Sequence, residues 1–347
     1  MITRSLVTTL LLVPLALASG CQRTQTESPA PHDMPKSQPP AAATPTPPPA
    51  ELEIGYSALR ISLPVLVAEA RGLFRAHGLT VKLKRYETAQ PLVEEVLDGR
   101  IVAGGYAALP IVFTAAARSH AHVRLATAMI EDAAHPVSYL LKKRGNAAIQ
   151  KIADLRNKRV GVLPTLAYQK WLAAITAHAH LTPADVTVIP LAPPQQVSSL
   201  AEGVVDALFT NDPMATTAIA TGIAESFGPS APLVDVTGQP TWFGSFMLQP
   251  RFVQEQPAQA AALVAALDEA IAFITSDQAA ARKLFAPFAR EAERPHVDRY
   301  PPASYLRSAE LSDARLTQEL ATETKLGILD TTVDAKGVLL SAGPSAP

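Results

Sequence analysis

The sequence has almost no cysteine, since Cys21 is the only one among 347 residues. A single thiol forms no disulfide within the chain, although an export route would permit one. The rest of the chain therefore offers neither a thiolate metal site nor a cysteine for catalysis.

Charge of one sign is also missing. The chain has 30 Lys and Arg residues against 31 Asp and Glu residues, which gives a formal net charge of −1. Such a balance sets up no field that attracts nucleic acid or an anionic membrane. Beyond the N-terminal leader we find no uninterrupted apolar run of the roughly 20 residues that a membrane span needs.

Catalytic and metal-binding patterns are missing too. The sequence shows no glycine-rich phosphate loop, Ser-His-Asp set or paired carboxylates, so we expect a protein that is not an enzyme. His120 and His122 lie close together, as do His178 and His180. A spacing of two directs helical side chains to different faces, and no carboxylate cluster accompanies these pairs. We therefore expect no metal and no other cofactor.

The N-terminus reads as an export signal. Residues 1–20 combine the positive charge of Arg4, an apolar stretch over residues 6–17 and small residues at 18–20. Cys21 follows directly and resembles the lipidated cysteine of bacterial lipoproteins. Plain secretion with an incidental cysteine is the alternative. The pattern predicts a periplasmic or otherwise extracytoplasmic protein, anchored to a bacterial membrane through lipid on Cys21.

A proline-rich stretch follows the cysteine. Residues 22–50 hold nine of the 31 prolines and cannot bury enough apolar surface to fold. We expect residues 21–50 to form an extended tether with an upper reach on the order of 90 Å. Gln22 in place of aspartate does not enforce retention in the inner membrane under the bacterial sorting pattern. Residues 341–347 are predicted to fray.

One motif occurs twice in the remaining part. Residues 92–101 and 197–206 each predict an apolar-faced helix that stops at a glycine and leads into a strand. Gly99 and Gly203 are 203 − 99 = 104 positions apart. That spacing is too long for a solenoid repeat and fits two lobes of similar plan. Clefts between lobes commonly bind small molecules.

Strands alternate with helices throughout both lobes, which predicts an α/β fold of two lobes, each a mostly parallel sheet covered by helices. We expect a discontinuous lobe 1 of residues 51–140 plus 245–340 and a lobe 2 of residues 141–244, linked by residues 136–143 and 244–249. Expected strands are 51–56, 79–86, 101–104, 122–128, 158–163, 186–191, 207–209 and 233–236. Expected helices begin near residues 62, 92, 109, 165, 197 and 213, and helices over 258–285 and 316–326 end the chain.

Ligands of open α/β sheets lie beyond the carboxyl ends of the strands, where helix N-termini present free N–H groups. The loops at these ends, together with an aromatic pair near the return crossover, give the candidate ligand-binding residues Ser57, Leu59, Arg60, Gly105, Tyr106, Thr165, Tyr168, Asn211, Asp212, Trp242 and Phe243.

Several candidates have a structural alternative. Arg60 either clamps an anionic group or lies on the surface, and Asp212 either binds an amine or caps the following helix. Tyr106 and Tyr168 either wall the ligand or pack between elements, and Trp242 either contacts ligand or joins the core. The mixed pair of Arg60 and Asp212 does not choose between an anionic and a cationic ligand.

Three segments carry a family resemblance: residues 66–81, residues 152–162 and residues 203–207 with Asp212-Pro213 after them. The chain resembles substrate-binding proteins of ABC importers over roughly residues 52–335, specifically the nitrate/sulfonate/taurine and thiamine-pyrimidine group with the type II periplasmic binding fold. It departs from that pattern at Arg100-Ile101-Val102-Ala103, which lacks an aspartate, and at Asn157, which replaces a glycine.

The resemblance implies a solute-binding protein that takes a small-molecule ligand and has an ABC permease as its partner. We expect a monomer without a nucleic-acid partner that meets the membrane only through its lipid. Two alternatives stay open. One is a fold-sharing lyase or dehydratase with Asp212 as its base. The other is a ligand-sensing lipoprotein for a signalling partner.

Overall fold

The computed structural model describes residues 51–330 and 333–340 of the chain. The predicted export signal, Cys21, the tether and the C-terminal tail therefore lie outside the described residues.

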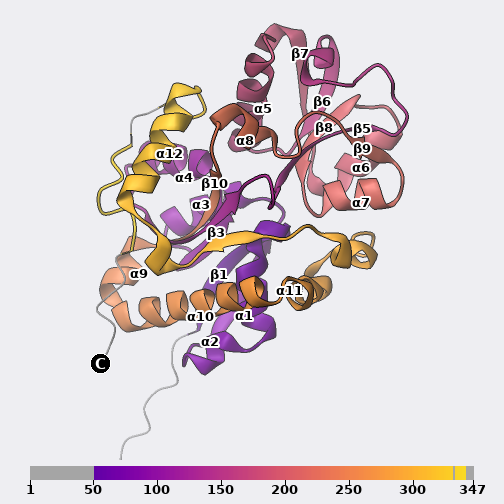
Figure 1. Cartoon of the computed structure of the whole chain (residues 1–347). Helices are drawn as coiled ribbons and strands as arrows, with labels where there is room; N and C mark the ends of the chain where they lie inside the picture. Colours follow the sequence, from indigo (N-terminus) through magenta and orange to yellow (C-terminus); the bar gives the residue numbers. More distant parts are fainter. Residues whose placement is uncertain (1–50, 331–332, 341–347) are drawn as a thin grey trace, which may run out of the picture. The chain divides into compact units, whose positions relative to one another are not determined.

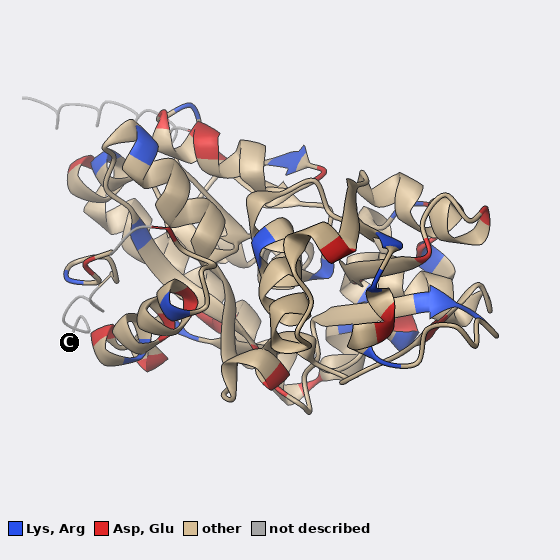
Figure 2. Ribbon diagram, turned by 90° about the horizontal axis from the view of Figure 1, so that it is seen from above, with Lys and Arg blue, Asp and Glu red and all other residues tan. Residues whose placement is uncertain are grey.

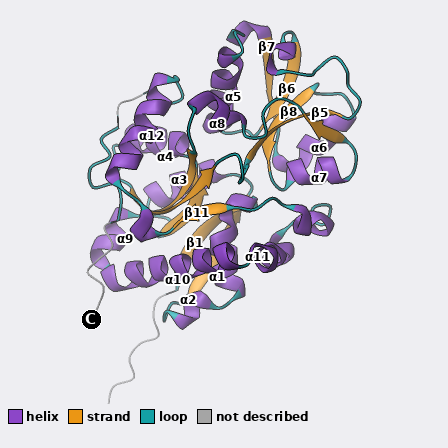
Figure 3. Cartoon of the chain, in the orientation of Figure 1, coloured by secondary structure: helices purple, strands orange, loops and turns teal. Residues whose placement is uncertain are grey.

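Two mixed β-sheets organise the described part (Figures 1 and 3). The first has the strand order β11-β4-β10-β3-β1-β2 and the second the order β7-β6-β8-β5-β9. The strands of the first sheet are β1 (Leu52–Ser57), β2 (Val81–Tyr86), β3 (Ala103–Ala107), β4 (Arg124–Glu131), β10 (Thr241–Leu248) and β11 (Ser304–Leu306). Those of the second are β5 (Ser138–Lys143), β6 (Lys158–Val162), β7 (Val186–Pro190), β8 (Ala207–Asn211) and β9 (Ala224–Ser226).

We call the first sheet with its helices lobe 1 and the second with its helices lobe 2. The strands β2, β1 and β3 pair in parallel, as do β7, β6 and β8. β10 and β5 pair antiparallel with their neighbours, because each enters its sheet from the other lobe without a covering helix. The predicted two-lobe α/β fold is confirmed, but the sheets are mixed rather than mostly parallel, because β10, β11, β5 and β9 pair antiparallel.

Helices cover both sheets. In lobe 1, α1 (Leu63–Ala70), α10 (Pro257–Ser276) and α11 (Gln278–Phe285) pack together on one face, and α3 (Ala89–Leu97) and α4 (Leu109–Ser119) lie on the other (Figure 1). In lobe 2, α5 (Leu166–His178) packs with α8 (Pro232–Thr237), and α6 (Pro193–Ala201) packs with α7 (Met214–Ala220). The remaining helical segments are α2 (Leu73–Ala76), α9 (Pro250–Glu255), α12 (Asp313–Lys325), η1 (Arg60–Ser62), η2 (Ile152–Leu155), η3 (Pro183–Asp185), η4 (Ala286–Phe288), η5 (Arg294–Arg299) and η6 (Ser308–Glu310).

Two glycines let α3 approach the sheet closely. A Cβ on Gly55 of β1 would lie 2.9 Å from the Leu92 side chain, and one on Gly104 of β3 would lie 2.8 Å from it. Leu92 is fully buried in this space. The first copy of the repeated motif is therefore seated directly on β1 and β3.

Some local predictions were wrong. Residues 233–236 form part of helix α8 rather than a strand, because Pro232 starts a helical turn and Gly238 ends it with φ 70°. The expected linkers 136–143 and 244–249 are largely strand, with β5 and β10 pairing inside the sheets. The expected lobe boundaries at 140/141 and 244/245 fall within these strands and stay predictions.

Helix breaks account for other differences. The expected helix from residue 62 stops before Gly72, whose φ is 69°, and resumes as α2. The Ser62 side chain does not cap α1, because its hydroxyl donates to the Gly105 carbonyl instead. The expected helix 258–285 is interrupted at Asp277, whose carboxylate accepts from the Ala280 N–H and starts α11.

Helix α10 is long and apolar enough, by length and composition, to cross a membrane. In this fold its apolar side packs against α1 and β4, with Leu263, Leu267 and Ile271 almost fully buried. Such packing is typical of the core helix of a globular domain. Figure 2 shows basic and acidic segments scattered over both lobes, as expected from the near-zero net charge.

Candidate functional site

A small cavity of about 20 Å³ lies where the two lobes meet. We call it the inter-lobe cavity. Both lobes contribute to its wall, which consists of Leu59, Ile61, Thr88, Ala89, Ala108, Ile111, Leu163, Thr165, Ala167, Tyr168, Trp171, Asn211 and Phe243. Five of the predicted ligand-binding residues are among them. The structure thus brings Leu59, Thr165, Tyr168, Asn211 and Phe243 together.

The parallel strands explain this convergence. Leu59 follows β1, Thr88 follows β2 and Ala108 follows β3, and these strands run in the same direction. In lobe 2, Thr165 follows β6, and its hydroxyl accepts from the Tyr168 N–H at 3.4 Å to cap α5. The carboxyl ends of both sheets therefore face one space, where α3, α4 and α5 begin.

Two residues of the cavity wall have polar side-chain atoms without a partner. The Asn211 side chain is fully buried, and neither its Nδ2 nor its Oδ1 has a hydrogen-bond partner among the described residues. The Tyr168 hydroxyl likewise has none, and burial raises the pKa of Tyr168 well above its usual value. Buried polar groups are normally paired. The space holds about one water molecule. Asn211 and Tyr168 therefore have hydrogen-bonding capacity that no described residue uses.

Aromatic rings close one side of the cavity. The Trp171 ring of α5 lies 4.8 Å, centroid to centroid, from the Phe243 ring of β10. Tyr168 packs against Trp171 at 5.4 Å. Because Phe243 comes from lobe 1 and Trp171 from lobe 2, this stack joins the lobes.

Arg60 and Asp212 form a buried ion pair beside the cavity. Arg60 Nε lies 3.1 Å from Asp212 Oδ2, and both side chains are almost wholly buried. The contact is ionic rather than a directed hydrogen bond, since the Nε–H has no acceptor in line. The other guanidinium nitrogens donate to the carbonyls of Pro136 and Pro301. Arg60 is therefore not a surface residue.

The environment sets the charge state of Arg60. Burial lowers the pKa of Arg60, but Asp212 and the surrounding tyrosines outweigh that effect and raise the pKa above its usual value. The guanidinium is charged, and its charge is balanced inside the protein.

Asp212 bonds the start of α7 and pairs with Arg60, whereas its role toward an amine ligand stays a prediction. Its Oδ1 accepts from the N–H and hydroxyl of Thr216 in the first turn of α7. Its Oδ2 contacts Arg60 and accepts from the Tyr139 hydroxyl at 3.4 Å. The carboxylate is thus engaged by the helix and by lobe 1 together.

Four other candidates lie in the core of lobe 1 and do not line the cavity. Ser57 bonds Ser62, and the Tyr106 hydroxyl bonds Thr127 at 2.7 Å. Trp242 Nε1 donates to Ser245 at 2.6 Å. A Cβ on Gly105 would lie only 2.7 Å from the Phe246 backbone. These positions are filled by packing within β1, β3 and β10.

Sequence reasoning missed several wall residues. Thr88 precedes α3 at the end of β2, and that strand end was not considered although β2 is parallel to β1. Trp171 of α5 was not among the candidates, yet it lines the cavity. The strand-end rule would have found Thr88, whereas the sequence offers no signal for the position of Trp171.

A buried carboxyl group holds the crossover from lobe 1 to lobe 2. Glu131 ends β4, and its Oε1 accepts from the N–H groups of Val137 and Ser138 at 2.8 and 2.6 Å. Burial raises the pKa of Glu131 to about 7, although these bonds and the charge of Arg60 oppose the shift. The crossover backbone is therefore tied to the sheet.

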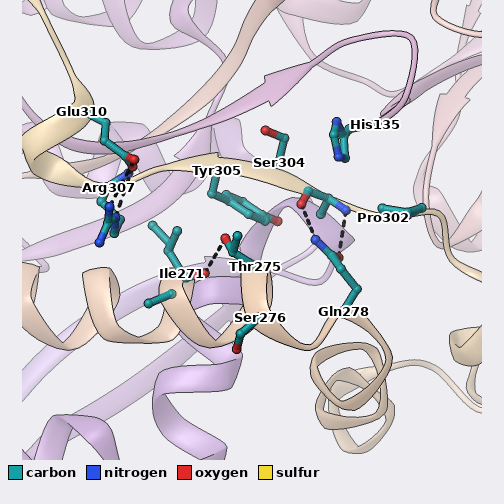
Figure 4. A pocket seen from close by; sticks show the side chains of 12 residues that line it. His135, Ile271, Thr275, Ser276, Gln278, Pro302, Ser304, Tyr305, Arg307 and Glu310 are labelled. Atoms are coloured by element: carbon teal, nitrogen blue, oxygen red, sulfur yellow. Dashed lines mark hydrogen bonds and ion pairs between the residues drawn. The ribbon is translucent and has the colours of Figure 1, made fainter.

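A larger groove of about 620 Å³ runs along α10 and β11 (Figure 4). Its polar groups pair with one another. Gln278 exchanges two hydrogen bonds with the Ala303 backbone, and Arg307 pairs with Glu310. The groove is open, and its lining presents no unpartnered buried side chain among the described residues. The inter-lobe cavity is therefore the better candidate.

The histidine pairs do not gather into a metal site. His120 and His180 adopt left-handed backbone conformations near the ends of α4 and α5, with φ 51° and 59°. Within residues 51–330 and 333–340, the structure places no three His, Cys, Asp or Glu side chains where they would hold a metal together.

Comparisons with known proteins agree with the fold. Residues 45–288 match the model of the NMT1-like family. The nitrate import ATP-binding protein NrtC of Synechocystis sp. is 26% identical over 242 residues, 63% of this chain and 34% of that protein. The chain thus spans about a third of the length of this curated relative.

Solved structures share the architecture. The alkanesulfonate-binding protein SsuA from Xanthomonas axonopodis pv. citri, bound to MOPS, has a TM-score of 0.66 at 22% identity, over 85% of this chain and 99% of that one. The desulfurization enzyme DSZB has a TM-score of 0.57 at 16% identity, over 83% of this chain and 96% of that one. Likeness at these identities shows the fold. The predicted resemblance to the nitrate and sulfonate group is confirmed.

Proposed function

Because this chain belongs to the NMT1-like family, we propose that it is an extracytoplasmic solute-binding lipoprotein. It captures a small organic or oxyanion ligand in the inter-lobe cavity and delivers it to an ABC importer. The observation that carries the proposal is the wall of that cavity, which both lobes build and which contains the unpartnered Asn211 amide and Tyr168 hydroxyl. NrtC and SsuA, named for nitrate import and alkanesulfonate binding, lend support.

Capture proceeds by closure of the lobes. Besides the pair of Arg60 and Asp212, the Leu166 N–H of lobe 2 donates to Gln90 of lobe 1 at 3.2 Å. These contacts break when the lobes part. A ligand favours closure only if it contacts the closed form better than the open one. Groups such as Asn211, which gain partners from a ligand enclosed by both lobes, provide that difference.

The membrane anchor is the second part of the proposal. Cys21 carries the lipid, and the proline-rich residues after it act as the tether. Growth with labelled palmitate is expected to label the intact protein and not a Cys21→Ala variant. Equal labelling of the two would contradict the anchor.

A fold-sharing enzyme receives less support, even though DSZB has a similar fold. A lyase or dehydratase needs a general base that faces the substrate. Asp212 does not line the cavity, and both its oxygens are engaged by neighbouring groups.

Ligand binding is tested by thermal shift on the mature chain with Cys21→Ser. The panel contains sulfonates, nitrate, aminopyrimidines, amino acids, flavins and aromatic acids. A ligand at 100 times its dissociation constant adds roughly 2.7 kcal/mol to stability.

Two matched tyrosine variants locate the site. Tyr168→Phe removes an unpartnered hydroxyl from a residue of the cavity wall, and Tyr300→Phe removes one from a residue outside that wall. We expect binding to weaken about fivefold in the first variant only, which corresponds to about 1 kcal/mol. Equal effects of the two would move the site elsewhere, and a panel without any hit would contradict the proposed function.

A further inference from the structure

The inter-lobe cavity has an uncharged wall. Its described lining residues include no Lys, Arg, Asp or Glu, and most are aliphatic or aromatic. The polar residues of the lining are Thr88, Thr165, Tyr168 and Asn211, and the side chains of the last two contain unpartnered polar atoms. An anion moved from water into such surroundings loses its hydration without gaining an opposite charge.

Two charged residues that adjoin the lining in the chain pair with each other. Arg60 adjoins the lining residues Leu59 and Ile61 in the chain, and Asp212 adjoins Asn211. The two side chains pair with each other at 3.1 Å, and carbonyl groups take the remaining guanidinium donors. In the closed form, an anion would have to displace the Asp212 carboxylate from Arg60. The carboxylate would then be left buried beside a second negative charge.

The unpartnered atoms of Asn211 and Tyr168 indicate which groups a matching ligand must have. An amide such as that of Asn211 offers one acceptor and a donor side by side, and a hydroxyl such as that of Tyr168 can donate or accept. The matching group on a guest is a neutral edge with its own donor and acceptor, as in a primary carboxamide. The rings of Trp171 and Phe243 provide flat apolar surface for the body of that guest.

We infer that the ligand is a small uncharged molecule with a flat apolar body and an amide-like edge, held by Asn211 and Tyr168, rather than an oxyanion. This inference rests on the proposed function and narrows its ligand class. A ring needs more room than 20 Å³, so the lobes part to admit it.

Calorimetry with three compounds of one shape tests the charge preference. Benzamide, benzoate and benzenesulfonate are titrated into the mature chain with Cys21→Ser, with nitrate and taurine added as small oxyanion probes. We expect benzamide to bind at least tenfold tighter than either aromatic anion. Tighter binding of any oxyanion would overturn the inference and leave the proposed function standing. If benzamide alone failed to bind, the inference would also be overturned. If no compound of this set or of the wider panel bound, the proposed function itself would be contradicted.

Two aspartate variants test whether the Arg60–Asp212 pair is the reason that anions are disfavoured. Asp212→Asn leaves the Arg60 charge unbalanced, so the ratio of benzoate to benzamide affinity should rise at least tenfold. Asp206→Asn breaks the exposed pair with Arg159 and is the control, with the ratio unchanged. An unchanged ratio in a folded Asp212→Asn protein would contradict the account. If Asp212→Asn does not fold, Asn211→Val provides the test. The inference requires that this variant bind benzamide at least tenfold more weakly than the wild type.

Discussion

Asn211 gives the sharpest test of whether the inter-lobe cavity was shaped for a ligand or for packing. Its side chain is fully buried at the end of β8, with both polar atoms unpartnered among the described residues. A buried polar group left without partners costs about 1–3 kcal/mol of stability. Asn211→Val removes that cost, and valine suits a strand position. We therefore expect the variant to be more stable than the wild type in the absence of ligand.

The expected gain follows from that penalty. A chain of this size shifts its melting temperature by roughly 2 °C for each kcal/mol, so the gain of about 1–3 kcal/mol appears as roughly 2–6 °C. One water bonded to Asn211 would place the value at the lower end. The same variant should lose ligand binding, because the amide no longer meets the guest. A substitution that raises stability and abolishes ligand binding indicates a residue kept for binding rather than for stability.

The assay compares melting curves and urea unfolding of the two proteins, without ligand and at saturation. A drop in melting temperature of Asn211→Val without ligand would refute the reasoning. It would mean that the amide has a structural partner and that the cavity is part of the core.

Three further predictions follow from the buried charges and the tight packing. Glu131→Gln should flatten the pH dependence of the free energy of unfolding in urea. Because the pKa of Glu131 is about 7 in the folded protein and 4.5 ordinarily, stability falls by up to about 3 kcal/mol as pH rises between these values. A variant with the same pH dependence as the wild type would contradict this. Asp212→Asn should lower the stability of the closed form by about 3–5 kcal/mol, measured as lobe opening in small-angle scattering or as a lower melting temperature. The double variant with Arg60→Met should recover much of this stability. Equal losses in the single and double variants would contradict a buried ion pair. Gly105→Ala should destabilise the protein by about 1–3 kcal/mol, because a methyl group would clash with the Phe246 backbone. The dissociation constant of any ligand should stay unchanged. Unchanged melting together with weaker binding in calorimetry would show that Gly105 belongs to the binding site.

The sequence predicted the plan of the fold because its signals are local. Each copy of the repeated motif has its own glycine stop and strand, and these became α3 with β3 and α6 with β8. The carboxyl ends of β8 and β6 then gave Asn211 and Thr165, since the carboxyl ends of parallel strands share an edge. The segment 233–236 misled because its β-branched residues favour a strand, whereas Pro232 and Gly238 bound a short helix.

The pairing of distant groups was beyond the sequence. The sequence left Arg60 open between an anion clamp and a surface residue, because nothing near it in the chain indicates a carboxylate partner. Its partner Asp212 belongs to the other lobe, and the two meet only after both sheets have formed. Glu131 escaped notice for the same reason, since its burial depends on how the crossover folds back over β4.

The central claim is that a ligand closes the two lobes over the inter-lobe cavity. The single cysteine makes a direct measurement practical, because Cys21→Ser leaves a chain without thiols. Spin labels at Arg118→Cys and Gln169→Cys would face each other across a groove that both lobes line. Both positions are exposed.

The distance between these labels is measured by pulsed electron resonance, with and without a compound that binds in calorimetry. The account predicts that saturating ligand moves the distribution from longer distances to one short distance, and that Asn211→Val abolishes this change. A distribution that stays the same while the compound binds would contradict capture by closure.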